Sequence, residues 1–384
     1  MKEDDFFMLA KTMYGLEKVL ANELIDLGAK NVKVLNRAVS FVGDKGFMYK
    51  ANINLRTCLS ILKPIATFQA YSKEDLYTKI YKMNWTRYFG LKHTFSTHAT
   101  TNSETFSHSK YASLVVKDAI VDKFRKKFRK RPDVDPVNAD IKIDIHIVKH
   151  TCTISLNSSG QSLHKRGYKL DTVVAPINEV LAAGLILLSG WNKVSNFHDP
   201  MCGSGTIVIE AALIAQNIPP NILREQFSFK KWKDYDKILF NKIKESSIRK
   251  KNHFNGEITG SDIFQKAIRI TRKNIEHIGM RDVIKVKNED FFESSMNKKV
   301  FVLFNPPYGQ RIPLGINEFY KKIGDTLKRN YVDCIVWLIS SDIENMKMIG
   351  LKPEEKINLL NGMLKCSFRK YSIYNGSKKT VILT

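Results

Sequence analysis

Two short segments in the second half of the chain carry residue types suited to chemistry on a planar amine. The first is Asp199-Pro-Met-Cys-Gly-Ser-Gly-Thr206, a loop between an apolar run and a helical pattern. The second is Asn305-Pro-Pro-Tyr308, which ends another apolar run. Glycines let a backbone approach a ligand closely. An amide, two prolines and an aromatic ring together predict a site that holds a planar base by one face and its amino group by hydrogen-bond acceptors.

Acidic residues follow two further apolar runs between these segments. Asp262 ends the first run and Asp290 follows the second. In a parallel sheet the carboxyl ends of the strands meet at one edge, where nucleotide-containing cofactors bind. Asp262 is expected to accept hydrogen bonds from both ribose hydroxyls, and Asp290 one from an adenine amino group. Gly203 and Gly205 would admit a methionine moiety and Thr206 would cap the next helix, so this pattern predicts S-adenosylmethionine.

Asn305 and Pro306 suggest how an amine would be activated. An exocyclic amine conjugated to a ring is a poor nucleophile. Hydrogen bonds from its N–H groups to the Asn305 side-chain oxygen and the Pro306 carbonyl favour a pyramidal nitrogen, whose lone pair then points at the methyl group. The prolines hold these acceptors in place before reaction. We expect Tyr308 to stack on the base, which must be flipped out if it lies in a helix, and the methyl group to transfer in line from the sulfonium.

The charge of the chain indicates what carries this amine. Its 384 residues include 62 Lys and Arg against 38 Asp and Glu, a net charge of +24. Clustered cations gain affinity for a polyanion by releasing its counterions, so nucleic acid is the expected partner. The run from Lys123 to Arg131 ends a helical pattern, and we assign Lys126, Lys127 and Arg129 to phosphate contact. A solvated helix face is the alternative for this run.

The cysteines and the apolar stretches of the sequence indicate whether a metal site is expected and in which compartment the protein works. The five cysteines are far apart, with no pair at metal-ligand spacing, so no metal site is expected. No apolar stretch reaches the length of a membrane span, and the Met1-Lys-Glu-Asp-Asp start lacks the basic-then-apolar order of a signal peptide. We therefore expect a cytoplasmic protein with reduced thiols.

The elements that must position these residues follow two patterns. Before residue 160, short alternating runs and amphipathic helices indicate an α+β region, with helices at 15–27 and 109–131 and a hairpin at 141–156. After it, apolar runs separated by helices indicate a parallel sheet covered on both faces. The strands are predicted at 194–199, 257–262, 283–288, 300–305, 333–339, 365–374 and 380–383. A long polar stretch at 219–255 is predicted to be a helical insertion.

At these residues the chain resembles the THUMP-containing RNA guanine-N2 methyltransferases, and among them the bacterial enzymes that act on 23S ribosomal RNA. The resemblance covers essentially the whole chain. It implies an α/β fold with a ferredoxin-like subdomain at 1–60, a THUMP RNA-binding domain at 61–160 and a seven-stranded Rossmann-like class I methyltransferase domain at 161–384. The motifs that support it are Arg131-Pro-Asp-Val-Asp135, the hairpin from Ile141 to Ile147, Leu163-His-Lys-Arg-Gly-Tyr168, Ala175-Pro-Ile-Asn-Glu179 and Asn305-Pro-Pro-Tyr-Gly-Gln-Arg311. Asn178 and Gln310 depart from the family pattern, which more often has a basic and an acidic residue there.

The motifs and the resemblance together imply three sets of site residues. The catalytic set is Asn305, Pro306, Pro307 and Tyr308. The cofactor set is Asp199, Pro200, Cys202, Gly203, Ser204, Gly205, Thr206, Asp262, Ile263, Asp290 and Phe291. The RNA-contacting set is His164, Lys165, Arg166, Tyr168, Gly309 and Arg311, together with Lys126, Lys127 and Arg129.

Other functions fit part of the same pattern. A transfer RNA guanine-N2 methyltransferase is the nearest alternative, because it has the same modules and the Asn-Pro-Pro-Tyr motif contacts only the base. A non-catalytic ribosome-assembly factor that binds RNA and keeps an inactive cofactor pocket is an alternative of another class. The motif also serves adenine-N6 methyltransferases of DNA and glutamine-N5 methyltransferases of release factors, but the RNA-binding region and the basic charge argue against a protein substrate.

The resemblance also bears on how many reactions to expect. Some family members carry a second methyltransferase domain after the first, whereas this sequence ends at Thr384. We therefore expect only the guanine-N2 reaction, on 23S ribosomal RNA or a large-subunit assembly intermediate.

Overall fold

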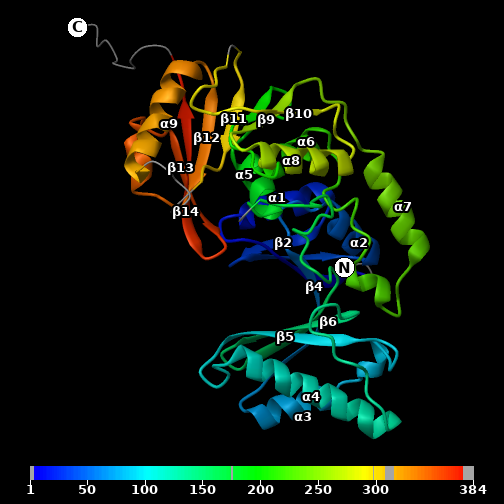
Figure 1. Ribbon diagram of the computed structural model, residues 1–384. Helices are drawn as coiled ribbons and strands as arrows, with labels where there is room; N and C mark the ends of the chain where they lie inside the picture. Colours follow the sequence, from blue (N-terminus) through cyan, green and yellow to red (C-terminus); the bar gives the residue numbers. More distant parts are fainter. Residues whose placement is uncertain (1–3, 174–175, 297, 308–314, 375–384) are drawn as a thin grey trace. The chain divides into compact units, whose positions relative to one another are not determined.

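The computed structural model describes residues 4–173, 176–296, 298–307 and 315–374. Several predicted features lie outside these ranges: Ala175, Tyr308, Gly309, Gln310, Arg311 and the strand at 380–383. The chain divides into two compact units (Figure 1). The N-terminal unit comprises Met1–Thr12, Leu20–Lys165 and Arg224–Arg249, and the C-terminal unit comprises Met13–Val19, Arg166–Leu223 and Lys250–Thr384.

One seven-stranded sheet runs through the N-terminal unit, in the order β2-β3-β1-β4-β7-β6-β5. The central strand β4 pairs with β1 at its start and with β7 over the rest of its length. The boundary predicted at residue 60, between the ferredoxin-like subdomain and the THUMP domain, therefore falls at the start of the strand that joins the two parts of the sheet. The strands are β1 (Phe6–Lys11), β2 (Lys30–Leu35), β3 (Ala38–Gly43), β4 (Ser60–Gln69), β5 (Phe95–Asn102), β6 (Ile141–Val148) and β7 (Thr151–Asn157).

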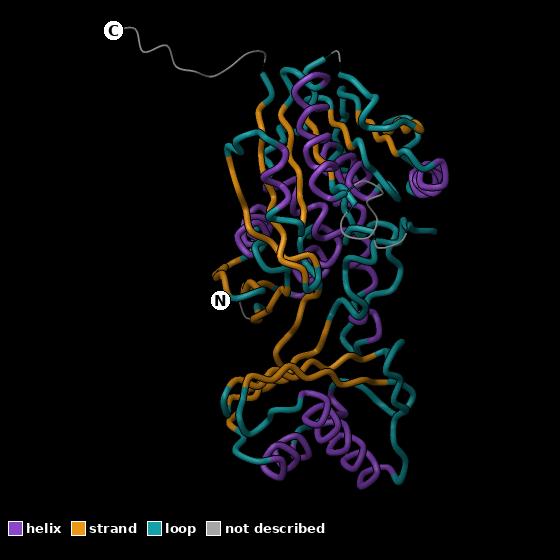
Figure 2. Tube along the Cα trace, turned by 60° about the vertical axis from the view of Figure 1, so that its left-hand side comes forward, coloured by secondary structure: helices purple, strands orange, loops and turns teal. Residues whose placement is uncertain are grey.

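The helices of this unit cover the face of the sheet to which the apolar residues of its strands point. The predicted hairpin is confirmed as β6 and β7, and the four isoleucines of β6 are buried while the residues between them are not. Helices α3 and α4 lie on one face of the sheet near β5 and β6 (Figure 1, Figure 2). The helical elements are α1 (Glu17–Leu27), α2 (Lys45–Asn54), α3 (Lys73–Lys82), the 3-10 turn η1 (Trp85–Arg87), α4 (Ser109–Phe128), η2 (Ser228–Lys231) and α7 (Lys237–Ile248).

The C-terminal unit holds a second seven-stranded sheet, in the order β10-β9-β8-β11-β12-β14-β13. The first five strands are parallel, and β14 runs antiparallel to both of its neighbours. The predicted seven-stranded class I sheet is therefore confirmed, although its edge strand β13 was not predicted. The strands are β8 (Phe197–Asp199), β9 (Ile258–Asp262), β10 (Ile284–Asn288), β11 (Phe301–Phe304), β12 (Ile335–Ser340), β13 (Glu355–Asn361) and β14 (Leu364–Ser372).

Helices cover both faces of this sheet, which explains why β11 and nearly all of β12 are buried. On one face α9 packs Phe319, Tyr320 and Ile323 against Val302 of β11 and Val336 of β12. Helices α5, α6 and α8 lie on the opposite face (Figure 1). No helix in the described part of the chain is long and apolar enough to cross a membrane. The helical elements are α5 (Glu179–Leu188), α6 (Thr206–Ala215), α8 (Gln265–His277), α9 (Ile316–Asn330) and η4 (Asn345–Ile349).

The insertion predicted at 219–255 is helical, with η2 and α7, and residues 224–249 of it pack in the N-terminal unit. The Arg224 guanidinium donates hydrogen bonds to the carbonyls of Ser159 (2.9 Å) and Ser162 (2.8 Å). The ring of Phe229 lies 4.6 Å, centroid to centroid, from that of Tyr49 on α2. The predicted methyltransferase domain at 161–384 therefore contains a segment whose packing belongs to the N-terminal unit.

Candidate functional site

The predicted cofactor and catalytic residues follow neighbouring strands of the C-terminal sheet. Asp199 ends β8, Asp262 ends β9, and Asn305 comes directly after β11. Because β9, β8 and β11 are adjacent and parallel, their carboxyl ends lie at the same edge. Asp290 follows β10, the next strand outward. The structure therefore brings these four side chains to one edge of the sheet, where ligands of such folds bind.

The glycine loop after β8 is fixed to β9 and α8 by its own backbone. The Cys202 N–H donates to the Ser261 carbonyl (2.9 Å), and the Gly203 N–H donates to Oδ2 of Asp262 (2.9 Å). The Gly203 carbonyl accepts a hydrogen bond from Oγ1 of Thr271 on α8 (2.8 Å). The loop and the second acid are thus a single hydrogen-bonded unit. The sequence did not reveal Thr271, because which face of α8 meets the loop is a tertiary property.

Two glycines of this loop are required by its conformation. Gly203 and Gly205 have φ angles of +55° and +80°, in the left-handed region that side chains disfavour. A Cβ on Gly205 would also lie 2.6 Å from Cγ2 of Thr271. Gly205, not Thr206, is the N-cap of α6, so the prediction that Thr206 caps this helix is wrong. The Thr206 hydroxyl is buried and has no hydrogen-bond partner among the described residues.

The two acids at the centre of the site are buried without a cation. Asp199 is 1% exposed and Asp262 is 8% exposed, and neither forms a salt bridge within the described residues. Burial raises the pKa of Asp199 well above its ordinary value, and the nearby Asp262 carboxylate adds to this, whereas the Met201 N–H opposes it. Burial likewise raises the pKa of Asp262, against hydrogen bonds from the Phe264 and Gly203 N–H groups. Two such acceptors fit a ligand that brings its own hydrogen-bond donors and a positive charge.

Beyond Asp262 the edge of the site is apolar and exposed. Ile263, a predicted cofactor residue, is 56% exposed, and Phe264, which was not predicted, is 69% exposed. An apolar pair directly after a strand-ending acid is a sequence signal that could have found Phe264. The side-chain amide of Asn288 donates to the carbonyls of Asp262 and Ile263, both at 2.8 Å, and so ties β10 to this turn.

The third acid and its neighbour have different surroundings. Asp290 is partly exposed, and its Oδ1 accepts a hydrogen bond from the Phe292 N–H (2.9 Å). The predicted cofactor residue Phe291 is only 2% exposed, and its ring packs against those of Phe304 and Tyr331. Its side chain therefore belongs to the core, and a cofactor contact would have to be made by its backbone.

The remaining predicted loop residues are placed as follows. Pro200, Cys202 and Ser204 are buried within the glycine loop. Burial raises the pKa of the Cys202 thiol well above its ordinary value, so this thiol is protonated at neutral pH and acts as a packing group. After β11, Asn305 is partly exposed, Pro306 is buried and Pro307 is half-buried.

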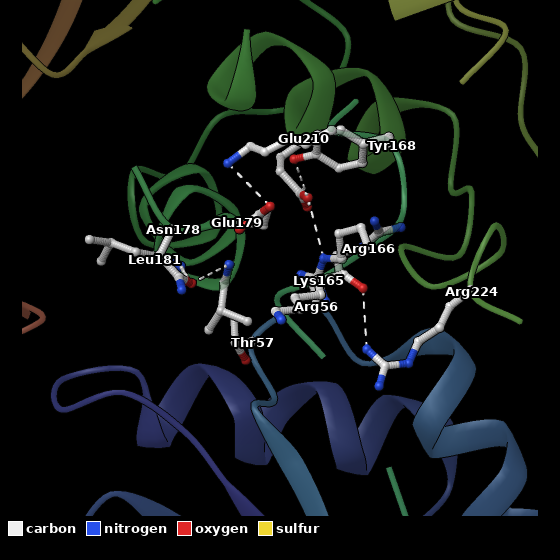
Figure 3. Close-up of polar contacts among 12 residues, drawn as sticks. Arg56, Thr57, Lys165, Arg166, Tyr168, Asn178, Glu179, Leu181, Glu210 and Arg224 are labelled. Atoms are coloured by element: carbon white, nitrogen blue, oxygen red, sulfur yellow. Dashed lines mark hydrogen bonds and ion pairs between the residues drawn. The ribbon is translucent and has the colours of Figure 1, made fainter. Parts of the chain in front are cut away.

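The motif between the two halves of the chain is largely interior. Arg166 and Tyr168 are 1% and 0% exposed, and both contact Glu210 on α6 (Figure 3). Oε1 of Glu210 lies 3.4 Å from Nε of Arg166 and accepts a hydrogen bond from the Tyr168 hydroxyl (3.1 Å). The prediction that Arg166 and Tyr168 contact RNA does not fit this arrangement, because both side chains are enclosed with a carboxylate. They instead anchor the segment that enters the C-terminal unit to the helix that follows the glycine loop.

Among the described residues, the other basic side chains predicted to contact RNA belong to the N-terminal unit and are more accessible. Lys165 is exposed, and Nδ1 of His164 lies 2.9 Å from the Ser162 hydroxyl oxygen. Lys126, Lys127 and Arg129 are exposed at the carboxyl end of α4, which Arg129 ends in a left-handed conformation.

The departure of Asn178 from the family pattern has a local explanation. Asn178 is the N-cap of α5, and its Oδ1 accepts hydrogen bonds from the N–H groups of Val180 (2.9 Å) and Leu181 (3.4 Å) (Figure 3). Asparagine is among the preferred residues at this position.

Comparison with known proteins assigns three segments of the chain to families. Residues 166–370 match a family described as RMKL-like methyltransferase domain, residues 70–157 match the THUMP domain, and residues 8–62 match the RlmL ferredoxin-like domain. The Synechocystis protein slr0064, named a putative RNA methyltransferase, is 34% identical over 94% of this chain and 95% of its own length.

Two further relatives are informative. The ribosomal RNA large subunit methyltransferase K/L of Shewanella frigidimarina is 33% identical over 97% of this chain but only 54% of its own length. The chain thus spans about half of this relative. The crystal structure of SMU.472 complexed with SAH superposes with a TM-score of 0.85 at 28% identity, covering 98% of this chain and 100% of that one.

Proposed function

Because the chain belongs to the family of RMKL-like methyltransferases, with a THUMP domain before the catalytic domain, we propose that it methylates the N2 amine of a guanine in 23S ribosomal RNA in the cytoplasm, with S-adenosylmethionine as donor. The observation that carries this proposal is the edge of the C-terminal sheet. There, a glycine loop, two buried acids and Asn305 follow three adjacent parallel strands.

The residues present fit the cofactor. Gly203 and Gly205 would let the backbone approach the ligand, and the loop is already bonded to Asp262 through the Gly203 N–H. Asp262 would accept the ribose hydroxyls, and Asp199, buried without a cation among the described residues, would face the charged methionine end. The exposed side chains of Ile263 and Phe264 offer apolar surface to the adenine ring. When bound, S-adenosylmethionine supplies a methyl group on a positively charged sulfur.

The amine would be activated by the segment after β11. The Asn305 side-chain oxygen and the Pro306 carbonyl accept hydrogen bonds from the amine and favour the pyramidal nitrogen of the transition state. Pro306 is buried and Pro307 half-buried, which supports a rigid arrangement of these acceptors. Tyr308, beyond the described residues, would stack on the base after it is flipped out.

Two observations support RNA as the substrate. The N-terminal unit contains the segments that match the ferredoxin-like and THUMP domains, and the chain carries a net charge of +24. The K/L relatives are named for large-subunit ribosomal RNA, and this chain corresponds to about half of them. Large-subunit ribosomal RNA, free or in an assembly intermediate, is therefore the substrate to test first.

The decisive experiment is methyl transfer from labelled S-adenosylmethionine to separate pools of unmodified 23S ribosomal RNA, 16S ribosomal RNA, transfer RNA and DNA. Each product is digested to nucleosides and analysed by mass spectrometry. N2-methylguanosine confined to 23S RNA is the expected result. Label in transfer RNA would make the protein a transfer RNA enzyme, and methylation of another base atom would overturn the assigned amine.

A cofactor-site variant controls for contaminating activity. Asp262→Ala should lose most of its affinity for S-adenosylmethionine by calorimetry, and its labelling of RNA should fall with it. Wild-type protein that binds the cofactor but labels none of the pools, including a large-subunit precursor particle, would favour the non-catalytic assembly factor.

A further inference from the structure

A cavity of about 380 Å³ lies within the N-terminal unit, which contains none of the residues assigned to methyl transfer. Its walls come from β4, from the end of η1 and from the insertion that precedes α7. The side chains that matter for its chemistry are Lys63, Arg87, Tyr88, Trp232, Lys233 and Asp234. Its volume is in the range of small-ligand sites and exceeds what a phosphate group alone would fill.

The cavity has an excess of positive charge that the protein itself leaves uncompensated. Lys63, Arg87 and Lys233 face a single acid, Asp234, whose carboxylate is already 3.8 Å from Nζ of Lys45. Within the described ranges, the side chains of Lys63 and Arg87 form no hydrogen bond or salt bridge, whereas the Lys233 ammonium donates to the Thr86 carbonyl. The Lys63 ammonium instead lies 4.0 Å from the ring centroid of Phe6.

Lys63 is also partly removed from water. Burial lowers its pKa, and the neighbouring charges of Lys45 and Arg87 lower it further, while Asp234 opposes this. A half-buried cation among like charges is unfavourable for the protein alone. An anion bound in the cavity would reverse the sign of this local field and stabilise all three groups.

The same cavity offers aromatic surface and an unused donor. Trp232 is 7% exposed, and its indole N–H has no hydrogen-bond acceptor among the described residues. Tyr88, which directly follows η1, is half-buried and also lines the cavity. The register between β4 and β7 shifts between Pro64 and Ala66, an irregularity typical of strands next to binding sites. Cations beside aromatic rings are the combination with which proteins hold single-stranded nucleic acid.

We propose that this cavity binds one nucleotide of a single-stranded segment of the RNA, with the phosphate on Lys63 and Arg87 and the base against Tyr88 and Trp232. This proposal rests on the proposed function, because it takes the bound nucleotide to be part of the substrate RNA. It also gives the insertion a role, because residues 232–234 supply one wall of the cavity. The RNA would then be held at a nucleotide other than the one that is methylated.

Fluorine NMR of the full chain labelled with 5-fluorotryptophan tests this directly. The chain has four tryptophans, and Trp232→Phe identifies the resonance of the one in the cavity. The probes are single-stranded RNA hexanucleotides, a nucleoside monophosphate and inorganic phosphate, each titrated at the same ionic strength. We expect a saturable shift of the Trp232 resonance with the hexanucleotide, a weaker effect of the monophosphate, and none from phosphate at matched concentration.

Charge-removing variants define the site. Lys63→Met and Arg87→Gln should each weaken the hexanucleotide affinity read from Trp232 about five- to tenfold, because each removes a phosphate contact. Lys110→Gln removes an exposed cation of α4 that does not line the cavity, and it should change this affinity less than twofold. Circular dichroism of each variant confirms that the fold is retained.

The outcomes separate this proposal from the proposed function. A Trp232 resonance unaffected by hexanucleotides, or one that inorganic phosphate or free nucleotide saturates more tightly than RNA, overturns the cavity as an RNA site. In either case methylation of 23S RNA by the wild type leaves the proposed function intact. Conversely, a shifted Trp232 resonance in a protein that methylates no ribosomal RNA would support the cavity and refute the proposed substrate.

Discussion

At the scale of single residues, Asp199 and Asp262 are expected to lower the stability of the ligand-free protein. Both are buried carboxylates with raised pKa values and no cationic partner among the described residues. When burial raises the pKa of an acid in the folded state, folding takes up a proton between its unfolded and folded pKa values. The free energy of unfolding therefore falls as pH rises through that window, unless a ligand supplies compensating donors.

Asp199→Asn should accordingly stabilise the ligand-free protein at alkaline pH. Removing the buried charge is expected to raise the free energy of unfolding of the C-terminal unit by about 1–2 kcal/mol at pH 8. The gain should shrink as pH falls, because the raised pKa of Asp199 favours its neutral form in the wild type. Urea denaturation across this pH range measures it, with the exposed Asp26→Asn as control. A variant less stable than the wild type at pH 8 would mean that the fold compensates the Asp199 carboxylate.

Asn305 is assigned to the transition state, so its loss should affect rate and not binding. Asn305→Ala is expected to reduce the single-turnover rate about 100- to 1000-fold, since one preorganised hydrogen-bond acceptor is lost. Affinity for S-adenosylmethionine by calorimetry should stay within about twofold. Asn358→Ala, at an exposed position of β13, is the control. Equal losses of rate and cofactor affinity would remove Asn305 from the catalytic role.

At the scale of elements, the carboxyl end of α4 concentrates charge on an exposed turn. Its Arg125 is paired with Asp122 (3.2 Å), whereas Lys126 and Arg129 have no salt bridge in the described part of the chain. A helix carboxyl end favours cations through the helix dipole, so the cluster has a structural benefit as well as an RNA-binding interpretation. Only the salt dependence of binding distinguishes the two.

Replacing Lys126, Lys127 and Arg129 with glutamine should weaken RNA binding and flatten its salt dependence. If all three contact phosphates, the slope of log K against log salt should fall in magnitude by about 2 to 3. Filter binding from low to moderate salt measures the slope. The matched control replaces three exposed cations of α7 and its end, Lys237, Lys242 and Arg249. A slope equal to that of the wild type would restore the interpretation as a solvated helix face.

Glu210 links two elements, and its removal should be costly. It is fully buried on α6 and bonded to Arg166 and Tyr168. Glu210→Ala would leave the Arg166 charge enclosed without this carboxylate, so we expect a loss of about 3–5 kcal/mol in the free energy of unfolding. Glu276→Ala, which removes an exposed ion pair with Arg281, should cost less than about 1 kcal/mol. Similar losses for the two variants in urea denaturation would contradict the anchoring role of Glu210.

At the scale of the whole molecule, each unit has a hydrophobic core of its own. The core of the N-terminal unit includes Phe227, Phe229 and Phe240 of the insertion, although these residues stand in the middle of the C-terminal unit's sequence. The core of the C-terminal unit includes residues of β11, β12 and α9. The chain therefore leaves the C-terminal unit and returns to it, so the two units cannot be separated by one cut.

Separate cores predict separate responses to ligands. S-adenosylhomocysteine at 100 times its Kd should stabilise the C-terminal unit by about 2.7 kcal/mol through mass action. The N-terminal unit, which lacks the cofactor residues, should not respond. Fluorine signals of tryptophan during thermal unfolding resolve the two, because Trp85 and Trp232 lie in one unit and Trp191 and Trp337 in the other. Equal shifts of both transitions would show that the units unfold together.

The sequence by itself was enough to predict the class of fold and the cofactor, S-adenosylmethionine. Strand-ending acids, a glycine loop and Asn305 are local patterns, and the alternation of apolar runs with helices is enough to predict a parallel sheet. The isoleucine alternation of β6 likewise predicted its hairpin. The edge strand β13 was missed because its apolar pattern is short: only Leu359 of its seven residues is buried, and the strand lies at the outer edge of the sheet.

Only the tertiary structure decided which polar residues are available to a ligand. Arg166 and Tyr168 have the composition of an RNA-binding motif, yet Glu210, more than 40 residues away in sequence, encloses them in the interior. The insertion gave no functional signal in sequence, but it packs on the N-terminal unit and places Trp232 beside Lys63 and Arg87. The burial of a polar side chain and its hydrogen-bond partners depend on contacts between segments that are distant in sequence. A local pattern of residue types cannot specify such contacts.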